Sequence, residues 1–350
     1  MHQDGLIIRA RAPLRIGLAG GGTDLSPYCD EYGGSVLNAT ISNYAYATIQ
    51  PRAGDTINFV SNDLGSAEEL PLAAELETGC GLRLHRAVYN RIVRDYNDGQ
   101  PLALTLTTSV ECPEGAGLGA SSALVVAVIG AFKTLLGLPL GDFDIAHLAY
   151  EIERKDLAMS GGRQDQYAAT FGGMNFMEFA RNDRVIVNPL HLERRVLLEL
   201  EASIMLCFTG TSRVSSDIID QQVTAMETHR DKTLDALHQL KRDALEMKAA
   251  LLRNELHLLS DILRHSWEAK KTTASSVTSQ SINALYEEAL DAGGLAGKIS
   301  GAGGGGFMIL LVDPLKRENV KSRLEGHGAT LWSCKFSDEG VQGWTTPIGT

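Results

Sequence analysis

Three clusters of glycine interrupt the chain, and they limit what it can fold into more than any other feature. They lie at residues 20–22, at 115–119 and at 301–306. Each glycine loses more conformational freedom on folding than any other residue, so such clusters are expected only where bare backbone is needed. Binding of a ligand by backbone groups is the usual need.

The second cluster reads P-E-G-A-G-L-G-A-S-S-A at residues 113–123, between a predicted strand at 102–110 and a predicted apolar helix at 121–136. Alternate glycines let successive amides point into one concavity, and the N-terminus of the helix adds a positive dipole. This pattern predicts an anion site. Ser121 and Ser122 start the helix, where a hydroxyl can cap the backbone or bind a metal.

The third cluster contains G-x-G-x-x-G, but two common phosphate-binding loops are disfavoured here. It precedes a predicted strand at 307–312, whereas the dinucleotide fingerprint follows a strand and opens a helix. Lys298 is followed by isoleucine, whereas a Walker loop needs Ser or Thr at that point. A dinucleotide oxidoreductase and a P-loop enzyme are therefore both disfavoured.

Composition excludes several classes of protein. With 350 residues and 44% hydrophobic content, the chain is expected to form two globular domains. The net charge of -11 argues against nucleic-acid and membrane partners, and an anionic substrate would need a local cationic pocket. Five scattered cysteines predict neither a disulfide framework nor zinc. Because neither a secretory signal nor a membrane-spanning run is apparent, we expect a cytoplasmic protein.

The order of predicted elements favours an α+β fold, because strands and helices mix without strict alternation. A change in composition near residue 200 predicts domains at 1–200 and 201–350. The Leu-rich, charged stretch at 216–270 predicts two or three antiparallel surface helices, since the heptads of a coiled coil are not sustained. Other strands are expected at 6–10, 14–18, 44–49, 202–208 and 330–336, and helices at 84–96, 144–155, 281–292 and 315–326.

The three clusters together resemble the ordered motifs of the GHMP kinases. These motifs are R-A-P-L-R-I-G-L-A-G-G-G-T-D from Arg11, the second cluster, and K-I-S-G-A-G-G-G-G-F-M from Lys298. The resemblance implies an N-terminal domain like ribosomal protein S5 domain 2, a ferredoxin-like C-terminal domain, and ATP and Mg²⁺ as cofactors. Within the family, A-G-G-G-T-D most resembles the branch that phosphorylates C1 of a heptose 7-phosphate for nucleotide-heptose synthesis.

The resemblance also implies roles for individual residues. Asp165 would be the catalytic base or would orient the hydroxyl, and Arg15 would stabilise the transferred phosphoryl group or form a structural pair with Asp165. Glu153 precedes Asp165 by twelve positions, as in the sugar kinases of the family, and would hold Mg²⁺ with Ser121. The phosphates of ATP would bind at Gly115, Gly117, Leu118, Gly119, Ala120, Ser121 and Ser122.

The sugar would lie against the first cluster, and the third cluster would close over the nucleotide phosphates and the first motif from the C-terminal domain. The residues implied are Gly20, Gly21, Gly22, Thr23, Asp24, Gly303 and Gly304. Asp24 would accept hydrogen bonds from sugar hydroxyls, because an ionised carboxylate only accepts. A remote phosphate on the sugar needs a cation, and Arg213, with Lys270 or Lys271, is available.

Two alternatives stay open on the sequence alone. One is a fucokinase-like enzyme that acts on an unphosphorylated sugar, although such proteins usually carry a second catalytic domain. The other is a non-catalytic sensor of sugar and ATP, which has no need of a base such as Asp165. The anomer that is phosphorylated and the oligomeric state, a homodimer included, cannot be read from motif spacing.

Overall fold

The structure is a computed structural model that describes residues 6–210, 215–228 and 230–347. In this part of the chain the first sheet has the strand order β12-β1-β2-β5-β3-β4, and β6 joins β2 and β7. Neighbouring strands of this sheet pair antiparallel, except β3 and β5, which are parallel. The bounds are β1 (Leu6–Ala19), β2 (Gly34–Pro51), β3 (Thr56–Ser61), β4 (Ser66–Pro71), β5 (Leu104–Val110), β6 (Met174–Phe179), β7 (Val185–Pro189) and β12 (Gln342–Pro347).

Strand β1 carries the chain into the interior. Two strands were expected at 6–10 and 14–18, but the structure has one continuous strand that pairs with β2, with irregularities of register near Pro13 and Gly17. Side chains alternate between buried and partly exposed up to Arg11, and every residue from Ala12 to Ala19 is buried. The first glycine cluster therefore begins where this strand is covered on both faces.

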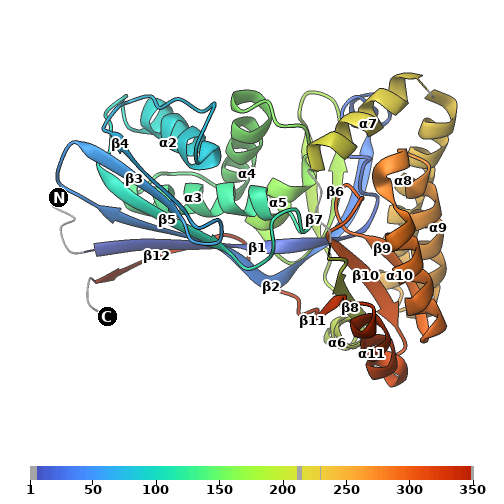
Figure 1. The fold of residues 1–350 in the computed structure, drawn as a ribbon. Helices are drawn as coiled ribbons and strands as arrows, with labels where there is room; N and C mark the ends of the chain where they lie inside the picture. The colour runs from blue at the N-terminus through green and yellow to red at the C-terminus, as the bar shows by residue number, and fades with distance from the viewer. Residues whose placement is uncertain (1–5, 211–214, 229, 348–350) are drawn as a thin grey trace.

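Helices cover one face of the first sheet (Figure 1). Helix α3 is apolar nearly all round, as a central helix must be, and packs on β1 and β2. It ends at Gly137, whose left-handed backbone closes the last turn. The helices of this part are α1 (Tyr28–Tyr32), α2 (Arg83–Tyr96), α3 (Ala120–Leu136), α4 (Asp142–Glu151), the π-helical turn η1 (Ile152–Asp156) and α5 (Gln164–Phe171).

The second sheet has the strand order β11-β8-β10-β9 and is antiparallel. When these four strands are numbered 1 to 4 in chain order, their order across the sheet is 4-1-3-2. This order confirms the ferredoxin-like arrangement implied by the motifs. The strands are β8 (Ile204–Phe208), β9 (Gly294–Ile299), β10 (Phe307–Val312) and β11 (Thr330–Ser333), and α10 (Gln280–Asp291) and α11 (Arg317–Gly326) accompany them.

The stretch at 216–270 forms helices, as predicted, and no long coiled coil. Helix α8 packs on α9 and on β1 and β2, while α9 also packs on β9, so the pair connects the two sheets (Figure 1, right). Trp267 and Leu251 are buried, so these helices are only partly on the surface. The bounds are α6 (Arg194–Ser203), α7 (Ser215–Thr228), α8 (Arg230–Leu252) and α9 (Leu259–Lys271), with 3-10 turns η2 (Leu256–Leu258), η3 (Ser275–Val277) and η4 (Pro314–Lys316).

Helix α6 ends at Ser203 and β8, the first strand of the second sheet, follows directly. The end of the chain does not stay with that sheet, because β12 pairs with β1. Residues 342–347 lie in the predicted second domain by number but in the first sheet by structure. Among the described residues, none of the helices is long and apolar enough to cross a membrane.

Candidate active site

The three glycine clusters meet where β1, α3 and β10 come together. The Arg15 amide donates to the Leu118 carbonyl at 2.9 Å, and the Phe307 amide donates to the Ala116 carbonyl at 2.9 Å. Gly117 has φ of +73°, and a Cβ there would lie 2.6 Å from the Ser300 carbonyl oxygen. The second and third clusters therefore pack backbone against backbone, which requires glycine at this contact.

Arg15 and Asp165 form an ion pair at this junction, as the sequence allowed. Arg15 Nε donates to Asp165 Oδ1 at 2.8 Å, and Nη2 lies 2.7 Å from the same oxygen. Arg15 Nη1 donates to the Gly117 carbonyl at 2.7 Å. The arginine side chain is only 4% exposed, whereas the aspartate side chain is 24% exposed. The carboxylate is thus held by a buried cation and remains accessible to a ligand.

Glu153 lies on the π-helical turn η1 and is 1% exposed. Ser121 Oγ donates to its Oε1 at 2.9 Å, and Ser122 Oγ donates to its Oε2 at 2.7 Å. The side-chain amide of Gln166 also donates to Oε2. A π-helical turn often marks a functional site, and here it directs the carboxylate at the start of α3. The predicted association of Glu153 with Ser121 is present.

Asp24 lies in the interior and holds the start of α5. Its Oδ2 accepts from the backbone amides of Arg163 and Gln164 at 3.0 and 3.2 Å, and its Oδ1 accepts from the Gly22 amide at 3.1 Å. A Cβ at Gly162 would overlap Asp24 Oδ2. Asp24 is 2% exposed, and its acceptors are used by the protein, so the predicted sugar contact stays a prediction that this arrangement does not favour.

Most of the first cluster is also explained by the fold. A Cβ at Gly20, where φ is +79°, would overlap the Ser35 carbonyl. Thr23 is fully buried, its hydroxyl is shared between the Gly20 and Ser35 carbonyls, and its amide donates to the Gly20 carbonyl at 3.0 Å. The predicted contact of Thr23 with substrate therefore stays a prediction that this arrangement does not favour. Gly21 differs, because a Cβ there would meet nothing nearer than Lys270 Nζ at 3.7 Å.

The other predicted residues take varied positions. Leu118 is fully buried and Gly119, at the N-cap of α3, lies against the Arg15–Asp165 pair. The Gly304 amide donates to the Val277 carbonyl at 2.7 Å, and a Cβ at Gly303 would meet the same residue. Phosphate contacts by these residues, and by Gly115 and Ala120, therefore stay predictions. Arg213 lies outside the described residues.

Two lysines are buried at this junction: Lys270, which was a candidate for the remote phosphate, and Lys298, to which the sequence analysis gave no role. Lys270 and Lys298 are each 2% exposed, and the charges of Lys270 and Arg15 act on Lys298. Burial lowers the pKa of Lys270 to about 8, while the nearby Asp24 and Asp165 carboxylates oppose the decrease. Burial and these neighbouring cations lower the pKa of Lys298 well below its usual range. An acidic chain thus gathers three basic side chains, Arg15, Lys270 and Lys298, at the junction.

Sequence reasoning also missed Gln164, Gln166 and Gly162, which bind or contact the carboxylates of Asp24 and Glu153. Their nearness to Asp165 in the chain was the available signal. Lys271 lies 2.6 Å from Glu268 in an ion pair and is 27% exposed, so it faces away from the buried junction.

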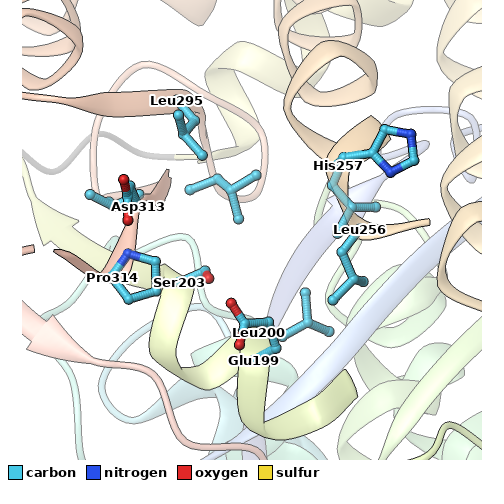
Figure 2. Close-up of a pocket in the computed structure, with 11 residues that line it drawn as sticks. Glu199, Leu200, Ser203, Leu256, His257, Leu295, Asp313 and Pro314 are labelled. Carbon is cyan, nitrogen blue, oxygen red and sulfur yellow. The ribbon is translucent and has the colours of Figure 1, made fainter. Parts of the chain in front are cut away.

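A separate groove of about 300 Å³ lies in the C-terminal part, between α6, η2 and the end of β10 (Figure 2). Leu200, Leu256 and Leu295 line it, together with the carboxylates of Glu199 and Asp313. Its lining includes none of the motif residues. The groove is therefore distinct from the candidate active site.

The chain matches the profiles described as GHMP kinases N terminal domain, at residues 83–173, and GHMP kinases C terminal, at residues 247–330. A D-glycero-alpha-D-manno-heptose 7-phosphate kinase from Campylobacter jejuni is 46% identical over 96% of this chain and 98% of its own length. An L-fucokinase/L-fucose-1-P guanylyltransferase from Bacteroides fragilis is 27% identical over 96% of this chain, which corresponds to 38% of that protein.

Among solved structures, a D-glycero-D-manno-heptose 1-phosphate kinase from Bacteroides thetaiotaomicron is 42% identical, with a TM-score of 0.82. The match covers 96% of this chain and 98% of that one. Matches to both domain profiles, and similarity along nearly the whole length of two relatives, show that this chain belongs to the GHMP kinases and has their two-domain α+β fold.

Proposed function

We propose that this protein transfers the terminal phosphoryl group of ATP to the C1 hydroxyl of D-glycero-D-manno-heptose 7-phosphate, which gives the 1,7-bisphosphate for nucleotide-heptose synthesis. The observation that carries the proposal is the accessible Asp165 carboxylate, ion-paired with buried Arg15 beside the N-terminus of α3. ATP is the phosphate donor of GHMP kinases, and the cytoplasm, where ATP is available, is the location that we propose.

Phosphoryl transfer to a hydroxyl asks for positioning and for neutralisation of charge. Asp165 would orient the sugar hydroxyl and accept its proton, because the carboxylate is accessible and stands in the first turn of α5. Arg15 cannot deprotonate and would stabilise the charge on the transferred group. The backbone of the second cluster and the start of α3 would bind the phosphates of ATP.

The oxygen donors at the start of α3 suit magnesium in their chemistry, although Glu153 is buried and its carboxylate accepts from Ser121, Ser122 and Gln166 in this structure. Ser121 Oγ and Glu153 Oε1 lie 2.9 Å apart, and both are hard oxygen donors of the kind that Mg²⁺ prefers. One carboxylate with one hydroxyl is a typical protein share of such a site, since phosphates and water supply the rest. The described residues hold no cluster of three or more His, Cys, Asp or Glu that could bind a metal without a nucleotide. Bound Mg²⁺ would neutralise charge on the ATP phosphates.

The heptose part of the proposal rests on the two relatives with more than 40% identity. One is named for a 7-phosphate substrate and the other as a 1-phosphate kinase, so the position that gains the phosphate has to be measured. The more distant fucokinase relative supports the alternative of an unphosphorylated sugar.

The test is phosphorus NMR of the product formed from ATP and Mg²⁺ with a panel of sugar 7-phosphates and 6-phosphates, heptose and fucose. The proposal predicts a new anomeric phosphate on heptose 7-phosphate, with the 7-phosphate retained. Selective turnover of fucose would favour the fucokinase-like alternative, and no turnover of any sugar would favour the sensor.

A cation is still needed for the 7-phosphate. Arg213 and Lys271 stay as candidates, and replacement of the correct one by alanine should raise KM for the phosphosugar far more than KM for ATP. Equal effects on both KM values would reject the assignment.

A further inference from the structure

Lys270 connects two of the glycine clusters. It lies in the last turn of α9, and its Nζ donates to the Gly301 carbonyl at 2.7 Å and to the Gly21 carbonyl at 3.3 Å. Gly21 belongs to the cluster expected to face the sugar, and Gly301 belongs to the cluster expected to close over the nucleotide. One side chain therefore bridges the loops for the two substrates.

The bridge is formed by a buried charge. Removal of an ammonium group from water is costly, so a buried lysine is expected only where several acceptors hold it. Two carbonyls accept from Lys270, which leaves its third N–H without a hydrogen bond to any described residue. Position near the C-terminus of α9 is favourable for a cation because of the helix dipole.

The charges that face Lys270 come from several elements. Asp24 follows β1, Arg15 lies on β1, Asp165 lies on α5 and Lys298 lies on β9. Two of them, Arg15 and Asp165, form the ion pair of the candidate site. The ammonium thus lies within electrostatic reach of the proposed base, although α9 belongs to the C-terminal part of the chain.

We infer that Lys270 is a positioning residue that ties the Gly21 loop to the Gly301 loop and thereby sets the distance between the sugar and the nucleotide. The inference rests on the proposed function, since it gives the loops their ligands. It replaces the expectation that Lys270 anchors the remote phosphate, because a 2% exposed side chain bound to both loops is not available at the far end of a sugar.

The substitution Lys270→Met removes the charge and both hydrogen bonds while it keeps the length of the side chain. Lys232→Met is the control, because Lys232 is an exposed lysine on α8 that is not part of the candidate site. We expect K270M to lower kcat about 100-fold, since small misplacement of reacting groups has effects of that size, while KM for ATP and phosphosugar changes less than threefold. K232M should retain wild-type kcat.

A second readout does not depend on turnover. Hydrogen exchange of the free protein should show lower protection of residues 300–306 in K270M than in wild type and K232M. If wild type turns over no sugar in the panel but this loss of protection is seen, the proposed function fails and the bridge stands. Unchanged protection, or a rise in KM for the phosphosugar with normal kcat, would overturn the inference.

A third measurement uses the native enzyme, so it tests the inference even if K270M does not fold. Because the pKa of Lys270 is lowered to about 8, its charge is present below that pH and is lost above it. We expect kcat/KM and the protection factors of residues 300–306 to decrease together as pH rises from 7 to 9.5. Values that stay constant over this range would contradict the bridge, as would a decrease of the same size in folded K270M.

Discussion

The two sides of the candidate site are built in different ways. On the acid side, Glu153 and Asp165 are held by side chains from the N-terminal part, with Ser121 and Arg15 among the donors. On the cation side, Lys270 comes from the C-terminal part and is held by backbone carbonyls of glycine loops. The acid side is therefore fixed without a ligand, whereas the cation side depends on the position of two loops.

This difference suggests that the two sides serve different steps of the reaction. Preorganised side chains suit the chemical step, because they need no rearrangement when charge develops. Loops that a single buried lysine connects suit the approach of two ligands. The comparison predicts that a change of the Asp165 carboxylate lowers kcat most. Changes of the residues that hold each side in place should have smaller effects on kcat or on stability.

The largest effect is expected for Asp165→Asn. The amide cannot accept the proton of the sugar hydroxyl, so kcat should fall about 10²- to 10⁴-fold. Its carbonyl oxygen can still accept from Arg15 Nε, so folding and ATP binding should be retained. Steady-state kinetics and titration with ATP measure both properties.

Asp142→Asn is a suitable control for that variant. Asp142 is exposed in the first turn of α4, as Asp165 stands in the first turn of α5, but it is not part of the site. Its activity should equal that of wild type. Near-normal turnover by D165N would remove the base assignment and with it the contrast between the two sides.

An intermediate effect is expected for Gly162→Ala. The new Cβ would overlap the Asp24 carboxylate and displace the start of α5, which carries Asp165. We expect a loss of about 1–3 kcal/mol in the free energy of unfolding, and a decrease in kcat of about 10- to 100-fold. Denaturant unfolding and kinetics on the same samples test this.

Gly326→Ala provides the comparison, because a Cβ there meets nothing within 4 Å and the residue lies at the end of α11. It should leave kcat unchanged. If G162A were as active and as stable as G326A, the acid side would be less rigid than we infer.

The smallest effects are expected for the serines that donate to Glu153. Ser121→Ala removes a proposed metal ligand, so the Mg²⁺ concentration at half-maximal rate should rise about tenfold. Ser122→Ala removes no proposed metal ligand, but it removes a buried hydrogen bond to the same carboxylate and one accepted from Gln166, so it should cost about 1–3 kcal/mol of stability. Mg²⁺ titration of both variants separates the roles, and identical Mg²⁺ dependence would contradict them.

Local sequence patterns predicted much of the fold. Alternation and apolar spacing located β5, α2, α3 and α10 to within a few residues, because packing on one face imposes those periods. Strand β4, largely exposed, has little apolar signal, and no local pattern can reveal that β12 returns to β1. Pairing between distant segments is decided by the whole fold.

The site was predictable only in its motif residues. The resemblance to the GHMP kinases indicated Asp165, Glu153 and Arg15, and the structure pairs Arg15 with Asp165 and Glu153 with Ser121. Lys270 looked like one of two adjacent lysines at the end of a charged helix, since burial depends on how α9 packs against loops far away in the chain. Gly162 appeared as a plain turn residue, because its contact with Asp24 exists only in the folded protein.

The central claim is that the sugar hydroxyl and the terminal phosphate meet at the Asp165 carboxylate. A crystal structure with heptose 7-phosphate and a non-hydrolysable ATP analogue tests it most directly. We predict that an Asp165 oxygen lies within about 2.6–3.2 Å of the C1 hydroxyl, with Arg15 facing the terminal phosphate. A complex in which Asp165 is remote from the triphosphate would contradict the account.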